Sequence, residues 1–160
     1  MYTRPHKFEA EQVLPIDLAR AWAFFSSPGN LSIITPPEME FKILTNNLSP
    51  EIYNGMIIDY RVKPLAGIPM KWRTEIRNVT HLKTFTDIQL IGPYKKWEHT
   101  HTFTACEEGV LMKDEIIYML PFGILGSLAH RMMIKNKIEK IFLYRRSVLL
   151  KLFPDERHRV

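Results

Sequence analysis

Hydrophobic and polar residues alternate through most of the chain, which is the period of a β-strand with one buried face. Short turns join successive alternating segments, so we expect the strands to pair antiparallel. The predicted strands are Lys7–Leu14, Glu40–Thr45, Met56–Lys63, Met70–Val79, Thr84–Ile91, Trp97–Ala105 and Val110–Leu120. The pattern therefore predicts a curved antiparallel sheet of about seven strands.

The spacing becomes helical at two places outside this sheet. Asp17 is suited to cap a short helix over 17–27, and a second short helix is expected over 29–34. Apolar residues recur every three or four positions over 125–153, and Pro154 ends this long helix. We therefore predict one α+β domain spanning residues 1–160, with two short helices after the first strand and a long C-terminal helix.

The alternation also sorts the strand residues into two faces. One face is mostly charged or carries threonine, so we expect it to meet water. The other face is Ile58, Tyr60, Val62, Trp72, Thr74, Ile76, Trp97, His99, His101, Phe103, Met112, Asp114, Ile116 and Tyr118. A slip of one residue would exchange the two faces, so the second set should point inward, toward the long helix.

Strand register decides which polar residues meet on this inner face, because directly opposed residues share a face. The expected pairs across turn 92–95 are Ile91–Trp97, Gln89–His99, Asp87–His101 and Phe85–Phe103. Across turn 106–109 they are Ala105–Val110, Phe103–Met112, His101–Asp114, His99–Ile116 and Trp97–Tyr118. This register gathers five polar residues on an apolar surface: Asp87, Gln89, His99, His101 and Asp114.

Three interpretations of this polar cluster stay open. In the first, it is a self-contained network in which His101 bonds both aspartates and Gln89 serves His99. In the second, it orients a small guest in an apolar cavity. The ligand-binding candidates are then Tyr60, Trp72, Asp87, Gln89, Trp97, His99, His101, Phe103, Met112, Asp114, Tyr118 and Met132.

The third interpretation is catalysis, in which His101 with Asp87 or Asp114 would form a general acid–base pair. The His-x-His pattern at 99–101 could also hold a metal with an aspartate, but this pattern alone is a weak signal. We therefore expect neither a metal nor a cofactor. The sequence contains no GxGxxG, Walker, HExxH or CxxC pattern, which argues against the enzymes that these motifs mark.

Composition narrows the remaining classes of function. The chain has 160 residues, of which 46% are hydrophobic, as is usual for one globular domain. Cys106 is the single cysteine, the N-terminus lacks an apolar leader, and no stretch approaches the roughly 20 apolar residues of a membrane span. We expect a cytoplasmic protein, a monomer or homodimer, without a membrane span.

The positive charge is concentrated at the C-terminal end. The net charge is +5, and residues 127–160 contain nine Lys or Arg but only three Asp or Glu. Basic residues without interleaved aromatic ones are more typical of a solvated helix face than of a nucleic-acid site. The expected partner is therefore a small hydrophobic molecule and not nucleic acid.

Several segments resemble one protein family. They are SSPGNLSIITPP (26–37), DIQLIGPYKKWEHTHTF (87–103), DEIIYMLPFGILG (114–126) and the stretch Ile141–Arg145. Together with the order of elements, they resemble the START/Bet v 1-like (SRPBCC) superfamily, and within it the bacterial ligand-binding proteins labelled polyketide cyclase or dehydrase. The resemblance implies a helix-grip fold that binds lipids, polyketides or aromatic molecules between sheet and helix. It transfers no catalytic residue, and it implies an entrance near Pro64–Pro69 and residues 123–126.

Overall fold

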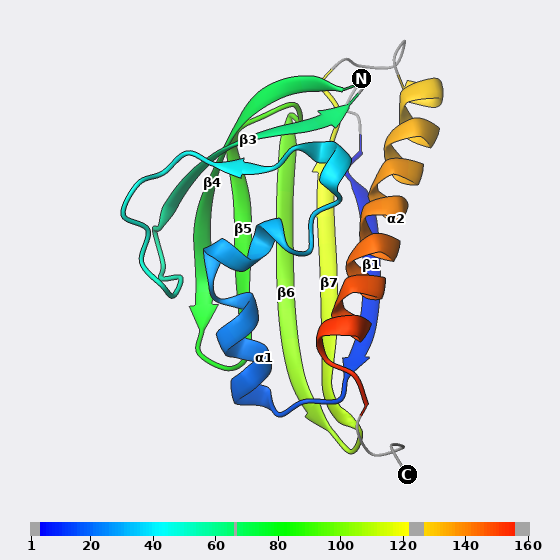
Figure 1. Ribbon diagram of the computed structural model, residues 1–160. Coiled ribbons are helices and arrows are strands. Elements are labelled where there is room, and N and C mark those ends of the chain that lie inside the picture. The colour runs from blue at the N-terminus through cyan, green and yellow to red at the C-terminus, as the bar shows by residue number, and fades with distance from the viewer. Residues whose placement is uncertain (1–3, 66, 122–126, 156–160) are drawn as a thin grey trace.

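The computed structural model describes residues 4–65, 67–121 and 127–155, and it has one antiparallel sheet of seven strands in the order β1-β7-β6-β5-β4-β3-β2. The strands are β1 (His6–Leu14), β2 (Lys42–Ile43), β3 (Ile57–Leu65), β4 (Ile68–Thr80), β5 (Thr84–Ile91), β6 (Lys96–Cys106) and β7 (Gly109–Met119). The helices are α1 (Leu18–Phe25), the 3-10 turns η1 (Pro28–Ser32) and η2 (Pro37–Met39), and α2 (Ser127–Leu152). Both α-helices lie on one side of the sheet, with α2 along its β1–β7 edge (Figure 1).

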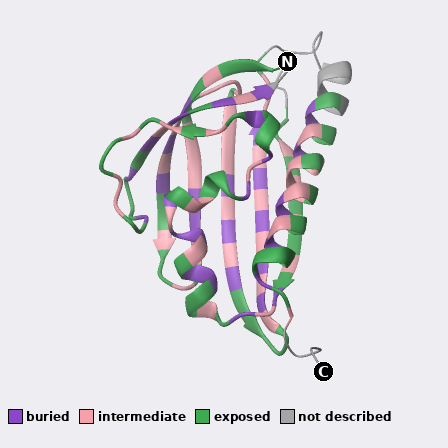
Figure 2. Cartoon of the chain, in the orientation of Figure 1, coloured by how far each residue is buried: buried purple, intermediate pink, exposed green. Residues whose placement is uncertain are grey.

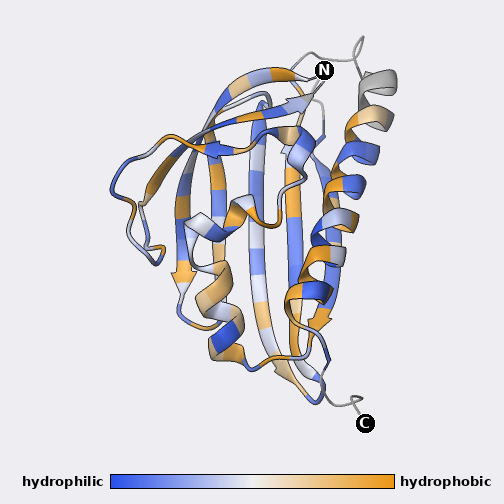
Figure 3. Cartoon of the chain, in the orientation of Figure 1, coloured by the Kyte–Doolittle hydropathy of each residue, from blue (hydrophilic) through white to orange (hydrophobic). Residues whose placement is uncertain are grey.

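The predicted faces of the sheet are confirmed. Of the fourteen inward residues, every one except Trp97 is buried, and Trp97 is intermediate. Buried residues alternate with less buried ones along the whole of β7, and Figure 2 shows this banding on the central strands. The hydropathy of the chain follows the same period (Figure 3). The sheet therefore has its apolar side toward the helices, as period-two sequence alternation requires.

The register of β6 with β7 matches the prediction at every expected pair, including His101 opposite Asp114. The predicted register of β5 with β6 is wrong by two residues, because Asp87 lies opposite His99 and Phe85 opposite His101. The last β5–β6 pair is Ile88 with Glu98, so the connection is longer than a tight turn. A shift of two residues keeps each side chain on its face, so the polar residues still point inward.

Two predicted elements differ clearly in extent. β2 contains two residues where six were expected, and the second short helix is the 3-10 turn η1. The expected entrance segment Pro64–Pro69 connects β3 with β4, and Leu65 of β3 pairs with Ile68 of β4. The other expected entrance segment, residues 123–126, lies outside the described residues.

The start of α1 and the buried side of α2 both follow from local features of the sequence. The Asp17 side chain caps α1 by accepting a hydrogen bond from the Arg20 backbone N–H at 2.8 Å. In α2, Ile134, Ile138 and Leu149 are buried, whereas Leu143 is 67% exposed on the opposite side. Among the described residues, no helix is both long and apolar enough to cross a membrane.

Candidate functional site

A cavity of about 190 Å³ lies between the inner face of the sheet and helix α2. Its walls come from η1, from the β3–β6 side of the sheet and from the inner side of α2, where Ile138, Ile141 and Phe142 contribute. Most of the lining is apolar or aromatic. Polar groups gather at one wall, where β5 and β6 contribute Asp87, His99 and His101.

The structure brings only part of the predicted set to this cavity. Tyr60, Trp72, Asp87, Trp97, His99 and His101 line it. Phe103 and Met112 are buried in the core instead, and Phe103 packs against Trp22 and Phe25 with ring centroids 5.8 and 5.4 Å apart. Tyr118 belongs to a neighbouring apolar cluster, and Asp114 lies behind the histidines. The Met132 side chain falls outside the described part of α2.

Gln89 does not hydrogen-bond His99, although the first interpretation of the polar cluster required it. Its Nε2 donates to the backbone carbonyl of Tyr94 at 2.7 Å, and its Oε1 accepts from the Tyr94 N–H at 3.3 Å. Gln89 therefore closes the loop between β5 and β6. This contact directly follows the last β5–β6 pair, Ile88 with Glu98.

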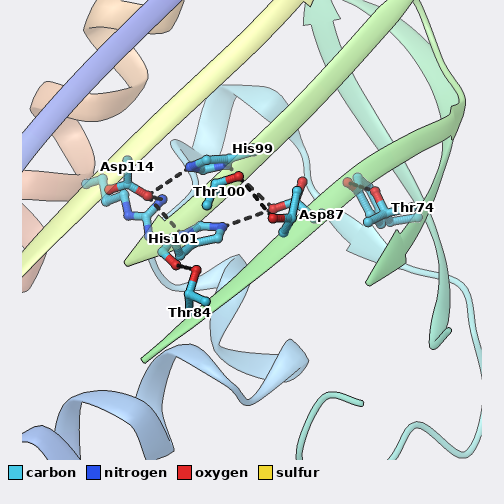
Figure 4. Close-up of polar contacts among 10 residues, drawn as sticks. Thr74, Thr84, Asp87, His99, Thr100, His101 and Asp114 are labelled. Carbon is cyan, nitrogen blue, oxygen red and sulfur yellow. Dashed lines mark hydrogen bonds and ion pairs between the residues drawn. The ribbon is translucent and has the colours of Figure 1, made fainter. Parts of the chain in front are cut away.

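The two histidines lie between the two aspartates (Figure 4). His99 Nε2 is 2.8 Å from Asp114 Oδ1, and His101 Nε2 is 3.0 Å from Asp87 Oδ2. The other two ring nitrogens also face carboxylates: His99 Nδ1 is 3.6 Å from Asp87 Oδ2 and His101 Nδ1 is 2.9 Å from Asp114 Oδ1. Despite its short distance, the second of these contacts lacks hydrogen-bond geometry. Each imidazole thus presents one nitrogen to each carboxylate.

Aromatic neighbours hold this pair of imidazoles in place. The two histidine rings are 3.9 Å apart between centroids, and Phe85 stacks on His101 at 4.3 Å. The Phe142 ring of α2 meets His99 edge-on at 5.8 Å. Because both imidazoles are buried and packed on several sides, their orientations are restricted before any ligand arrives.

Arg145 of α2 is a site residue that sequence reasoning missed. Its guanidinium is buried, lies 3.5 Å from Asp114 Oδ1, and sits over the rings of Phe25 and Phe142 at 5.4 Å each. A usable signal was present, since Arg145 continues the helical spacing of the buried positions Ile138 and Leu149. A charged residue in a buried helical stripe needs a partner, and the inward-facing aspartate was the available one.

The carboxylates are held ionised by these neighbours. Burial alone would raise the pKa of Asp114, but the charge of Arg145 and the close contacts with the two histidines outweigh it, so the pKa falls well below its usual range. The pKa of Asp87 is also lowered, because His99 and His101 offset the effect of burial. The site therefore holds two negative charges against the positive charge of Arg145.

The two imidazoles are shifted in opposite directions. Burial, followed by the neighbouring charge of His101, lowers the pKa of His99. Burial also opposes protonation of His101, but the two flanking carboxylates prevail and raise its pKa. The lowered pKa leaves His99 neutral at neutral pH, whereas the flanking carboxylates favour the protonated form of His101. A neutral imidazole beside a cavity can act as a base, as a hydrogen-bond partner or as a metal ligand.

Trp72 of β4 has a polar atom without a hydrogen-bond partner. Trp72 lines the cavity and is buried, and its indole Nε1 has no hydrogen-bond partner among the described residues. Nearby, the Tyr60 hydroxyl is already bonded to the Thr74 hydroxyl at 2.9 Å, and burial raises the pKa of Tyr60. Leaving a buried donor unpaired costs about 1–3 kcal/mol, so Trp72 can gain from a guest that accepts a hydrogen bond.

No family model matches the sequence, and a search of curated proteins finds no match. Solved structures do match. TTHA0849 from Thermus thermophilus is 17% identical, with a TM-score of 0.64 over 92% of this chain and 99% of that one. Ara h 8.0201 is 16% identical, with a TM-score of 0.58 and the same coverage of the two chains. This chain has the helix-grip fold.

A third similar structure is the di-domain ARO/CYC protein StfQ from the steffimycin biosynthetic pathway. It is 14% identical with a TM-score of 0.71, covering 98% of this chain and 53% of StfQ, so this chain spans about half of that protein. The helix-grip fold expected from the sequence is thus confirmed. At these identities the likeness establishes the fold, and fold alone assigns no activity.

Proposed function

We propose that this protein binds one small, largely apolar molecule in the cavity between the sheet and α2. The observation that carries the proposal is an apolar cavity with polar groups converging on one wall, namely Asp87, His99 and His101. This is the usual composition of a ligand site, in which apolar walls supply affinity and a few polar groups set orientation. Solved proteins of the same fold include an aromatase/cyclase, which supports an organic guest.

The volume of the cavity limits the size of the molecule that it can bind. An engineered cavity of about 150 Å³ holds benzene, and pockets for drug-sized ligands measure about 300–1,000 Å³. A cavity of about 190 Å³ therefore suits a substituted single ring or a molecule of similar size. Such a guest would accept a hydrogen bond from Trp72 while its polar substituent meets the histidines.

The test is a titration with p-cresol in which tryptophan fluorescence reports binding, because Trp72 and Trp97 both line the cavity. In the variant Ile138→Phe, the larger ring would project into the cavity, and we expect binding to weaken about tenfold or more. The matched control is Leu143→Phe, which makes an apolar substitution on the exposed side of the same helix and should bind as the wild type does. Equal affinity in all three folded proteins would refute the proposal.

A second candidate function is acid–base catalysis on the guest. The observation that favours it is the neutral His99, which is oriented through Nε2 by the buried Asp114, with its Nδ1 on the side of Asp87. An imidazole oriented by a carboxylate in this way is a common general base. Native mass spectrometry of protein from its own cells can decide between the two candidates. An enzyme should retain guests of different mass in the wild type and in His99→Gln, whereas a carrier should retain the same guest.

A further inference from the structure

The polar wall of the cavity contains three donor atoms of the types that bind transition metals. One donor atom each from Asp87, His99 and His101 can be chosen so that all three lie within 4.8 Å of one another. His101 Nε2 is 3.0 Å and His99 Nδ1 is 3.6 Å from the same oxygen, Asp87 Oδ2. We propose that Asp87, His99 and His101 form a binding site for one divalent transition-metal ion such as Zn²⁺.

The spacing of these donors fits an ion without rebuilding the strands. Zinc binds imidazole nitrogen and carboxylate oxygen at about 2.0–2.1 Å, which places the ligand atoms of a tetrahedral site roughly 3.3 Å apart. The two distances to Asp87 Oδ2 lie on either side of that value. The alternating period supports the site too, because residues 99 and 101 of one strand share a face and Asp87 lies directly opposite His99 on β5.

The surroundings orient the histidines as metal sites do. A metal-binding histidine usually gives its second ring nitrogen to a carboxylate, which aligns the ring and sets the tautomer. Here Asp114 Oδ1 lies 2.8 Å from His99 Nε2 and 2.9 Å from His101 Nδ1, on the far side of both rings from Asp87. Asp114 therefore orients His99 by a hydrogen bond and lies in close contact with His101, and Arg145 in turn balances its charge.

The charge of the site and its open side toward the cavity also support a bound divalent ion. A metal-binding imidazole is neutral, so His101 gives up any proton on its cavity-facing nitrogen when the ion binds. Two aspartates then face one arginine, and a divalent ion would compensate the remaining negative charge. With three protein ligands, one position of a four-coordinate ion stays free, which is the arrangement of catalytic and not of structural zinc sites. Since all three ligand residues line the cavity, that position faces the space of the proposed guest. The ion could then bind an oxygen of the guest, although metal binding itself does not depend on one.

The experiment uses untagged, full-length protein treated with a chelator and dialysed. Calorimetric titration with ZnCl₂ should show one saturable ion per chain, and Co²⁺ should give the visible absorption bands of a low-coordinate nitrogen–oxygen site. His99→Gln, His101→Gln and Asp87→Asn should each bind at least about 100-fold more weakly. Asp114→Asn should lose about 10–100-fold, the usual effect of removing an outer hydrogen-bond partner.

His81→Gln is the matched control, because His81 also lies near a carboxylate, with Nδ1 3.5 Å from Glu51 Oε1, but is exposed. It should bind zinc as tightly as the wild type. Circular dichroism establishes that each variant is folded, and the wild-type titration is decisive on its own. Folded wild-type protein that takes up no saturable ion would overturn the proposal, and so would equal losses in His81→Gln and His99→Gln.

The metal site and the guest site can fail separately. The p-cresol titration is therefore repeated in excess chelator and again with one equivalent of Zn²⁺. Guest binding in chelator without any zinc uptake would leave the proposed function standing and remove the metal site. Zinc uptake without p-cresol binding would do the reverse.

Discussion

Replacing Arg145 with methionine should destabilise the protein strongly, because the substitution removes the charge that Asp114 faces from α2. Both side chains are buried, with exposed fractions of 8% for Arg145 and 7% for Asp114. Methionine keeps much of the apolar stem, so the packing of that stem should change little. What is lost is the guanidinium, and with it the ion pair and the contacts with two aromatic rings.

The expected loss in the free energy of unfolding follows from the burial of Arg145 and Asp114. Removing one partner of a buried ion pair typically costs about 3–5 kcal/mol. Asp114 keeps its contacts with His99 and His101, so we expect a value near the lower end, about 3 kcal/mol. For a chain of this size, each kcal/mol lowers Tm by about 2–4 °C, so Tm should fall by roughly 6–12 °C.

Urea denaturation at pH 7 measures this cost, and Arg146→Met is the control because Arg146 is the next residue of the helix and is exposed. The double variant Asp114→Asn/Arg145→Met tests the mechanism. If the two residues interact, its loss of stability should fall short of the summed single losses by about 0.5–3 kcal/mol. Additive losses, or equal stability of Arg145→Met and Arg146→Met, would refute the reasoning.

Two further predictions concern the sheet. Gly109 has φ +134°, and a Cβ there would clash with the Leu14 carbonyl oxygen. Gly109→Ala should therefore cost at least about 1–3 kcal/mol in urea unfolding, and Gly29→Ala, which has open space, is the unaffected control. Asp59 makes a two-pronged pair with Arg73 on the outer face, and hydrogen bonding to Arg73 lowers its pKa. A group whose pKa is lowered by folding stabilises the protein at pH values above its unfolded-state pKa. This stabilisation disappears as the pH falls through the folded-state pKa. Asp59→Asn should therefore cost at most about 1 kcal/mol at pH 7, and this cost should shrink steadily as the pH is lowered below the unfolded-state pKa; a constant difference would contradict the assignment.

The sheet was predictable because one physical signal, the alternation of apolar and polar residues, reports directly on burial. It identified the inward face and, with the tight turn 106–109, the full β6–β7 register. The β5–β6 register was not predictable in the same way, because the alternation of β5 is weak and its loop is closed by a side chain. Gln89 can bond the loop backbone or a neighbouring strand, and the pattern of the sequence does not distinguish these choices.

The candidate site was predictable to the extent that it lies within the sheet. Asp87, His99, His101 and Asp114 were placed on one face by period two alone, and a register error of two residues left that face unchanged. The volume of the cavity depends instead on how closely α1, η1 and α2 approach the sheet. This distance is set by side-chain packing between elements that are far apart in the sequence, and no local pattern encodes it.

The Arg145–Asp114 ion pair connects the inner face of the sheet, which the alternation predicts, with the position of α2, which no local pattern encodes. A buried arginine is costly without a partner, and a buried aspartate between two imidazoles needs a positive charge, so each accounts for the presence of the other. The pair links the helix to the strand that orients both histidines. The position of α2 and the arrangement of the polar wall are therefore coupled through Asp114. A substitution that shifts the helix should alter binding at the histidines even when it leaves every residue lining the cavity in place.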